Sequence, residues 1–338
     1  MIKVSAPGKV HIIGEHSVVY SKPAIIAAIS RRCYVTAEKA RGITIKSPVL
    51  DGDVSFSAKE ARSLADKADR LWGECFAKKD FTGLFSEMKK NRENALKAGI
   101  GKILSELDVN KGALLEINSG IPFGSGLGSS AALAVALTKA IAELNGKKLS
   151  LDEVNDISYK LEQYSHGTPS GGDNAACCFG NVIWFQKEPR LIKPVDAGKL
   201  EGFVIVYIKK PEKTTGELVQ LVRNLDEDYR SKRMDAIGKA TEEMLPALKA
   251  KDAGKIKQLI NLAQKNLAEL GVSCKEIDEV AEVVKSIGGA AKLCGAGGGG
   301  TMLCYHEDMK KLKEIIKQLG YEPLEVELGV EGIRKEYG

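Results

Sequence analysis

A glycine-rich turn that runs straight into an apolar helical segment limits the possible folds of this chain more than any other stretch. Residues 122–132 read PFGSGLGSSAA, and the apolar pattern at 129–146 predicts a helix. Glycines permit backbone conformations that a side chain would block, so several N–H groups can point at one place. The start of the helix adds partial positive charge there. The segment therefore predicts a phosphate-binding loop, with a close packing turn between strand and helix as the alternative.

Two hydroxyl groups follow these glycines, on Ser129 and Ser130. They stand where a magnesium ion bound to the phosphates can be reached, as in other phosphate loops. The loop is not a Walker A motif, because no Gly-Lys-Ser/Thr sequence follows it.

The size and charge of the chain exclude several other classes of protein. Its 338 residues suffice for two domains, and a polar stretch with two prolines at 187–200 predicts a boundary, so we expect domains at 1–190 and 191–338. The net charge of +5 suits a small anionic ligand and is too diffuse for nucleic acid. We expect a cytoplasmic protein, since the sequence shows neither a secretory signal nor an apolar stretch that could span a membrane.

The cysteines indicate reduced thiols. There are seven, an odd number, and they are widely scattered. Cys177 and Cys178 are adjacent, which is closer than zinc ligands usually stand, so no zinc site is expected.

The hydrophobic pattern predicts strands and helices that do not alternate strictly, which favours the α+β class. Capping-box patterns at Ser150–Glu153 and Thr214–Glu217 predict two helix starts. Strands are predicted at 2–6, 10–13, 24–40, 113–119, 181–186, 203–208, 291–294, 301–306 and 323–328. Helices are predicted within 56–106, at 129–146, from 150 to about 165, from 214, within 230–287 and at 307–319.

A second candidate segment surrounds a lysine between two predicted strands. Lys9 ends the sequence SAPGK, and Glu15 and His16 belong to GEHSVVY at 14–20. Taken alone, such a lysine is more often a surface charge and such a histidine more often a core residue.

A third segment consists of Glu162 and the sequence HGTPSGGDN at 166–174. Glu162 lies near the end of a predicted helix, whereas Asp173 follows a loop whose path is set by Pro169 and two glycines. A carboxylate placed by such a loop is a candidate for catalysis. The alternative is an Asx turn, in which Asp173 bonds its own backbone.

A fourth segment, KLCGAGGGG at 292–300, carries four consecutive glycines between two predicted strands. Glycines cost chain entropy on folding, so close approach to a ligand or to another loop would explain them.

These four segments, in this order and spacing, resemble the GHMP kinases, named for galactokinase, homoserine kinase, mevalonate kinase and phosphomevalonate kinase. The resemblance extends from about residue 2 to residue 333, and the loops at 122–132 and 295–300 are common to the superfamily. SAPGK with GEHSVVY, and HGTPSGGDN, resemble the mevalonate kinase branch. TTGELVQLVR at 214–223 and EGIRKE at 331–336 are similar to its archaeal-type members.

The resemblance implies a fold and an activity. The expected fold has two α+β domains, the first similar to ribosomal protein S5 domain 2 and the second ferredoxin-like, with the active site between them. The implied activity is ATP- and Mg²⁺-dependent phosphorylation of the C5 hydroxyl of (R)-mevalonate in isoprenoid biosynthesis, by a homodimer.

The resemblance also implies residue roles. Asp173 is the expected base near the attacking hydroxyl, and Lys9 is expected beside both. The expected ATP-binding residues are Pro122, Gly124, Ser125, Gly126, Leu127, Gly128, Ser129, Ser130, Ala131 and Ser170. The expected metal ligands are Glu162 and one of Ser129 and Ser130, and the expected substrate-binding residues are Glu15, His16, Gly295, Ala296 and Gly297.

Three departures from the family pattern bear on substrate specificity. His11 stands where a bulky apolar residue is usual, Cys294 stands where a threonine is usual, and the segment after Asp173 reads NAACCFGN. Two alternatives remain open: a GHMP kinase for another hydroxylated substrate, and a non-catalytic metabolite sensor. GEHSVVY with Asp173 argues against the first, and the retention of Lys9, Glu162 and Asp173 argues against the second.

Overall fold

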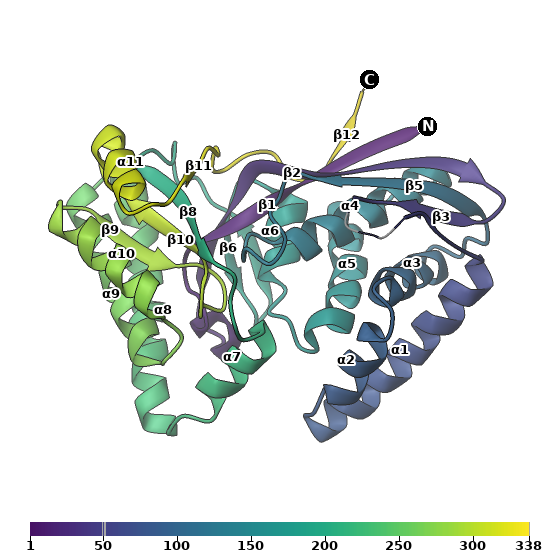
Figure 1. The fold of residues 1–338 in the computed structure, drawn as a ribbon, viewed down its shortest axis with the longest axis horizontal. Helices are drawn as coiled ribbons and strands as arrows, with labels where there is room; N and C mark the ends of the chain where they lie inside the picture. The colour runs from purple at the N-terminus through teal and green to yellow at the C-terminus, as the bar shows by residue number, and fades with distance from the viewer. Residues whose placement is uncertain (49, 51, 338) are drawn as a thin grey trace.

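Two halves, each built on its own β-sheet, make up the molecule (Figure 1). The computed structural model describes residues 1–48, 50 and 52–337. The larger half holds an eight-stranded sheet and the smaller half a four-stranded sheet. This two-domain α+β architecture confirms the expected fold class.

The larger sheet runs in the order β12-β1-β2-β5-β3-β4. The first residues of β2 pair with β6, and β6 pairs with β7. Its strands are β1 (Ile2–Ile13), β2 (Ala24–Ala40), β3 (Ile43–Lys46), β4 (Val54–Phe56), β5 (Gly112–Ser119), β6 (Val182–Gln186), β7 (Leu191–Pro194) and β12 (Arg334–Glu336). The strands predicted at 2–6 and 10–13 form one strand, because a register shift between Pro7 and Gly8 absorbs the expected turn.

Helices cover the lower face of the larger sheet in Figure 1. They are α1 (Ala58–Lys78), α2 (Thr82–Lys89), α3 (Asn94–Glu106), α4 (Ser129–Leu144), α5 (Leu151–His166) and α6 (Gly172–Phe179). Helix α4 packs against β1 and β2, and its buried face is rich in alanine, which lets it approach the sheet closely. The predicted capping box at Ser150 is present at the start of α5.

The smaller sheet runs in the order β11-β8-β10-β9. Its elements are β8 (Phe203–Lys209), α7 (Thr215–Arg223), α8 (Glu227–Ala250), α9 (Ala253–Glu269), α10 (Lys275–Ser286), β9 (Ala290–Leu293), β10 (Gly300–Tyr305), α11 (Met309–Gln318) and β11 (Pro323–Leu324). With α7 to α10 counted as one helical crossover, this is the ferredoxin-like β-α-β-β-α-β arrangement. The strand predicted at 323–328 pairs only at Pro323 and Leu324.

The chain passes from one half to the other twice. It leaves the larger sheet after β7 and later returns, so that β12 pairs antiparallel with β1. The buried side chain of Arg32 holds the returning segment, because its guanidinium donates to the carbonyl oxygens of Glu331 and Gly332. The division at residues 190 and 191 stays a prediction. Within the described residues, no helix has both the length and the apolar character needed to cross a bilayer.

Candidate active site

The predicted phosphate loop is a tight turn at the start of α4. Gly124, Gly126 and Gly128 all have positive φ, at 69°, 80° and 75°. A Cβ at Gly128 would lie 2.8 Å from Cγ of Lys9, so a side chain does not fit there. The buried Ser125 hydroxyl donates to the carbonyl of Pro122 at 2.7 Å and holds the turn closed.

Both halves of the molecule hold this loop in place. Leu127, which is buried, accepts a hydrogen bond through its carbonyl from the backbone N–H of Lys9 at 2.9 Å. From the smaller half, Thr301 donates its hydroxyl to the carbonyl of Ser125 at 3.0 Å. Ala131, in the first turn of α4, is fully buried and anchors the helix start.

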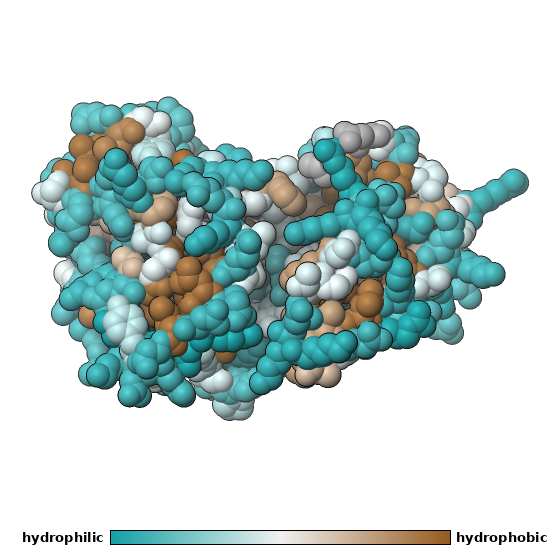
Figure 2. All heavy atoms as spheres, turned by 60° about the horizontal axis from the view of Figure 1, so that its bottom comes forward, coloured by the Kyte–Doolittle hydropathy of each residue, from teal (hydrophilic) through white to brown (hydrophobic). Residues whose placement is uncertain are grey.

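A small pocket lies where the two halves meet. Gly124 and Gly126 line one side of it. Residues of the smaller half line the rest: Pro211, Lys213, Thr215, Leu218, Cys294, Ala296, Gly297, Gly299 and Gly300. Figure 2 views the molecule from the side on which the halves part, and the surface is hollowed between them. The two glycine segments therefore face one another, as expected of loops that approach a common ligand.

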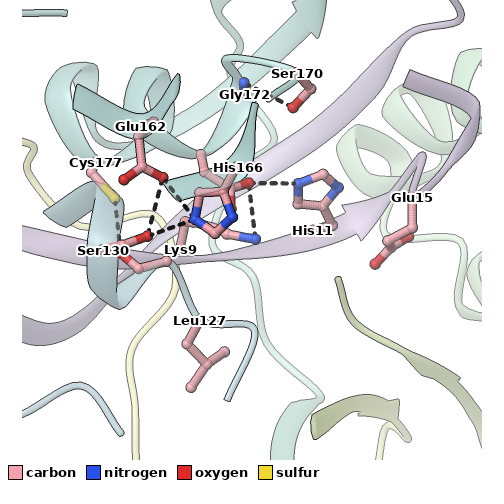
Figure 3. Close-up of polar contacts among 12 residues, drawn as sticks. Lys9, His11, Glu15, Leu127, Ser130, Glu162, His166, Ser170, Gly172 and Cys177 are labelled. Carbon is pink, nitrogen blue, oxygen red and sulfur yellow. Dashed lines mark hydrogen bonds and ion pairs between the residues drawn. The ribbon is translucent and has the colours of Figure 1, made fainter. Parts of the chain in front are cut away.

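An ion pair between Lys9 and Asp173 lies beside the loop. Figure 3 labels Lys9 among its neighbours Leu127, Ser130 and His11. Nζ of Lys9 is 2.9 Å from Oδ1 of Asp173, and the lysine side chain is only 2% exposed, so it is not a surface charge. Asp173 lies in the first turn of α6 rather than on a loop, and its bonds go to side chains of β1 rather than to an Asx turn.

The electrostatics keep both members of this pair charged. Burial acts to lower the pKa of Lys9, but attraction to Asp173 outweighs it and the pKa is raised. For Asp173, burial acts to raise the pKa, and the charge of Lys9 with the hydrogen bond from His11 brings it well below the ordinary range. The carboxylate is therefore ionised at neutral pH and can accept a proton or a hydrogen bond.

His11 is a site residue to which the sequence assigned no role. Its Nε2 is 3.3 Å from Oδ1 of Asp173, the same oxygen that Lys9 contacts. Successive side chains of a strand alternate between its faces, so Lys9 and His11, two positions apart on β1, point the same way. That spacing is the signal that could have identified His11.

A second buried carboxylate, Glu162 of α5, lies next to the start of α4. The hydroxyl of Ser130 donates to its Oε2 at 3.1 Å, and His166 Nε2 lies 3.6 Å from the same oxygen. Glu162 is 5% exposed, and burial raises its pKa despite the nearby His166.

The surroundings of Glu162 fit a magnesium ion that is held mainly by phosphates. Within the described residues no group of three or more His, Cys, Asp and Glu side chains is placed to hold a metal, and no lysine or arginine forms an ion pair with Glu162. Mg²⁺ prefers oxygen ligands and is commonly bound by one or two carboxylates plus substrate phosphates and water. A buried carboxylate beside a hydroxyl matches that requirement.

Glu15 and His16 point toward the smaller half rather than toward Asp173. Glu15 is 1% exposed and forms a buried ion pair with Lys292 of β9. His16, whose φ of 58° is unusual for a residue other than glycine, bonds the carbonyl of Ala296 at 2.9 Å through Nε2. In Figure 3, Glu15 stands apart from the cluster around Lys9.

The remaining predicted residues shape the backbone. A Cβ at Gly297 would lie 2.0 Å from the carbonyl oxygen of Val272, and Gly295 has a φ of 76°. Ser170 accepts a hydrogen bond from the N–H of Gly172 at 3.2 Å and so supports the turn that leads into α6. The structure thus gathers Glu15, His16 and the glycine segment 295–297 on one side and the Lys9–Asp173 pair on the other.

Known proteins share both halves of this architecture. Residues 94–181 match the GHMP kinases N terminal domain and residues 244–324 match the GHMP kinases C terminal domain. The mevalonate kinase of Thermococcus sibiricus is 31% identical over an alignment of 345 positions, which covers 99% of this chain and 98% of that protein.

Solved structures agree on the fold, but they include kinases named for different substrates and so do not indicate the substrate of this chain. The crystal structure of Methanococcus jannaschii mevalonate kinase has a TM-score of 0.79 at 23% identity and covers 96% of this chain and 98% of its own. Lactococcus lactis galactokinase complexed with galactose has a TM-score of 0.80 at 20% identity, over 99% and 95% of the two chains.

Proposed function

The chain belongs to the GHMP kinase family, and from this premise we propose that it transfers the γ-phosphoryl group of ATP to the C5 hydroxyl of (R)-mevalonate. The full-length similarity to proteins named mevalonate kinase supports this acceptor, whereas the shape of the fold does not discriminate, given the likeness to galactokinase. The observation that carries the proposal is the ion pair between the buried Lys9 and the half-buried Asp173 next to the phosphate loop.

The phosphate loop is the proposed site of the ATP phosphates. Its backbone N–H groups and the N-terminal end of α4 offer positive partial charge to the phosphate oxygens. The ATP-binding set comprises Pro122, Gly124, Ser125, Gly126, Leu127, Gly128, Ser129, Ser130, Ala131 and, at the edge, Ser170. Pro122, Ser125 and Ala131 act by holding the loop rather than by contact with charge.

Glu162 and Ser130 are the residues that would hold Mg²⁺, with Ser129 adjacent to them. When bound, the ion supplies charge neutralisation on the β- and γ-phosphates. Glu162 suits this role because its buried charge lacks a lysine or arginine partner among the described residues.

Asp173 and Lys9 act on the acceptor in this proposal. The carboxylate of Asp173 accepts the proton of the mevalonate hydroxyl, and Lys9 favours the developing alkoxide by its charge. The alkoxide oxygen forms a bond to the γ-phosphorus while the bond from that phosphorus to the bridging oxygen breaks, so that ADP leaves. Phosphoryl transfer depends mostly on positioning and charge, and this pair supplies both.

The segment containing Glu15 and His16 forms the proposed wall of the mevalonate pocket, together with Gly295, Ala296 and Gly297. The ion pair to Lys292 and the bond from His16 to Ala296 fix this wall across the two halves. Glu15 then acts by holding the backbone of this wall, because its charge is neutralised by Lys292.

A coupled ADP-release assay with Mg²⁺ and ATP tests the function. The panel contains mevalonate, phosphomevalonate, galactose and homoserine, and ³¹P and ¹³C NMR locate the phosphate on the product. We expect turnover with mevalonate alone and phosphate on the C5 oxygen. Turnover with another member of the panel would support kinase activity but refute mevalonate as the acceptor. ATP binding without turnover on any member would favour the non-catalytic sensor.

Two further expectations stay predictions. A homodimer is implied by the family resemblance, and multi-angle light scattering of the purified protein measures the mass directly. A cytoplasmic location is consistent with the cysteines, all seven of which are free thiols.

A further inference from the structure

Two donors from one strand converge on a single oxygen of Asp173. Lys9 Nζ lies 2.9 Å and His11 Nε2 lies 3.3 Å from Oδ1. The side chains of Lys9 and His11 are 2% and 6% exposed, whereas that of Asp173 is 39% exposed. Since Oδ1 contacts two buried donors, the exposed part of the carboxylate lies on the side of Oδ2.

Lys9 alone does not fix the plane of this carboxylate. The χ2 torsion of aspartate is broad, so a single contact to Oδ1 restricts the second oxygen less than two contacts from different directions do. A second donor, attached to a rigid β-strand at a different point, restricts that rotation. The backbone of His11 is held within the sheet, because His11 pairs with Ile26 of β2.

The protonation pattern of His11 follows from its partner. An ionised carboxylate only accepts hydrogen bonds, so Nε2 of His11 must carry the proton that it shares with Asp173. Nδ1 is buried and has no hydrogen-bond partner within the described residues. Nε2 is therefore the nitrogen through which His11 makes its polar contact in this site.

We propose that His11 is a positioning residue that, with Lys9, clamps Oδ1 of Asp173 so that Oδ2 faces the acceptor hydroxyl and takes its proton. This inference rests on the proposed kinase function in that Asp173 acts on an acceptor hydroxyl. It does not depend on the identity of the acceptor. His11 touches the base and not the substrate, so its removal acts through kcat rather than through nucleotide affinity.

Two substitutions separate the donor from the bulk of the ring. His11→Gln keeps an N–H group that can reach Oδ1, and His11→Leu fills similar space without a donor. We expect His11→Leu to lower kcat roughly 10- to 100-fold, the range for a slightly misplaced catalytic group, with KM for ATP unchanged. His11→Gln should recover most of that loss. His306→Leu, which removes a histidine from the smaller half, is the matched control and should leave kcat unchanged.

A double-mutant cycle shows whether His11 works through Asp173. In an Asp173→Asn background, His11→Leu should cause no further loss of the residual rate, because there is no carboxylate left to orient. Equal losses in both backgrounds, or equal losses in the Gln and Leu variants, would overturn the proposal. The cycle uses whichever acceptor of the panel the wild-type protein phosphorylates.

A measurement without turnover keeps the inference separate from the proposed function. Long-range ¹H–¹⁵N correlation spectra of the wild-type protein report which ring nitrogen of His11 carries hydrogen. We expect a proton on Nε2, with a resonance that shifts in Asp173→Asn. A neutral ring protonated on Nδ1 instead would refute the clamp even if the protein proves to be an active kinase. The Nε2 signal would support it if the substrate panel fails.

Discussion

Three charged side chains beside the phosphate loop differ in how the fold compensates their charge. Lys9 and Asp173 neutralise one another, which keeps both ionised. Glu162 has a hydroxyl and a histidine beside it, and its pKa is raised by burial. The residue with the least compensated charge is thus the one that gains most from a divalent cation.

Replacing Asp173 by Asn tests the base at the residue scale. The amide keeps the shape of the side chain and removes the proton acceptor, so kcat should fall roughly 10²- to 10⁴-fold. The dissociation constant for ATP, measured by calorimetry, should stay near that of the wild type. A variant with wild-type turnover would exclude Asp173 as the base, and circular dichroism checks that the fold survives the loss of a partner for Lys9.

Replacing Glu162 by Gln tests the proposed metal ligand. Removing one negative charge from the ligand set weakens Mg²⁺ binding, so the Mg²⁺ concentration for half-maximal rate should rise, and excess Mg²⁺ should restore part of kcat. Glu116→Gln, on the exposed side of β5, is the control and should leave the Mg²⁺ dependence unchanged. A Glu162→Gln variant whose rate does not respond to Mg²⁺ would contradict the ligand role.

The family resemblance pointed to Asp173, Lys9 and Glu162 and predicted Lys9 beside Asp173, a contact that the structure contains. Other partners of the candidate residues were not predicted. That Glu15 is neutralised by Lys292, 277 positions away, is a contact between distant segments that local patterns do not encode. His11 departs from the family pattern, and its contact with Asp173 depends on how α6 packs against β1.

The phosphate loop acts at the scale of an element, because it joins β1, α4 and the smaller half. Its glycines meet two different requirements. Gly124 has a positive φ and open space around its Cβ position, whereas Gly128 combines a positive φ with contact to Lys9. The two positions therefore separate backbone strain from steric overlap.

Alanine substitutions at these two glycines should differ in stability. Gly124→Ala should lower the free energy of unfolding by about 1 to 2 kcal/mol, the cost of a left-handed backbone at a residue with a Cβ. Gly128→Ala should lose a further amount of about 1 to 3 kcal/mol, because its Cβ overlaps the buried lysine stem. Urea unfolding without nucleotide gives both values. Equal losses would show that the overlap with Lys9 does not contribute to the destabilisation at Gly128.

Elements with a local signature were predicted well from the sequence. The capping boxes at Ser150 and Thr214 begin α5 and α7, and the long apolar run gives α4. Helix α6 was missed because its eight residues begin at glycines that indicate a loop. Strands β3 and β12 are short, and their existence depends on pairing with β5 and β1 rather than on their own residues.

At the scale of the whole molecule, several polar contacts connect the two halves, and three of them involve residues of the candidate site. These three are the Glu15–Lys292 ion pair, the bond from His16 to the carbonyl of Ala296, and the bond from Thr301 to the carbonyl of Ser125. Because Lys292 and Glu15 are 0% and 1% exposed, either charge left alone would be buried without compensation.

Replacing Lys292 by Met should therefore destabilise the protein by about 3 to 5 kcal/mol, the cost of breaking a buried ion pair from one side. The double variant Glu15→Met with Lys292→Met removes both charges and should regain a large part of that loss. Guanidinium unfolding of the two variants and the wild type measures the difference. Equal stability of single and double variants would mean that the ion pair does not carry the contact between the halves.

The return of β12 to the edge of β1 affects how the molecule is made. A ribosome releases β1 early and its edge partner late: Ser5 meets Glu336 only after 331 further residues have been added. Until then the guanidinium of Arg32 lacks the carbonyl oxygens of Glu331 and Gly332, and the strand edge beside it stays open. Unfinished chains on neighbouring ribosomes therefore expose the same unpaired edge of β1. A chaperone would protect the chain most during the time before β12 has been synthesised.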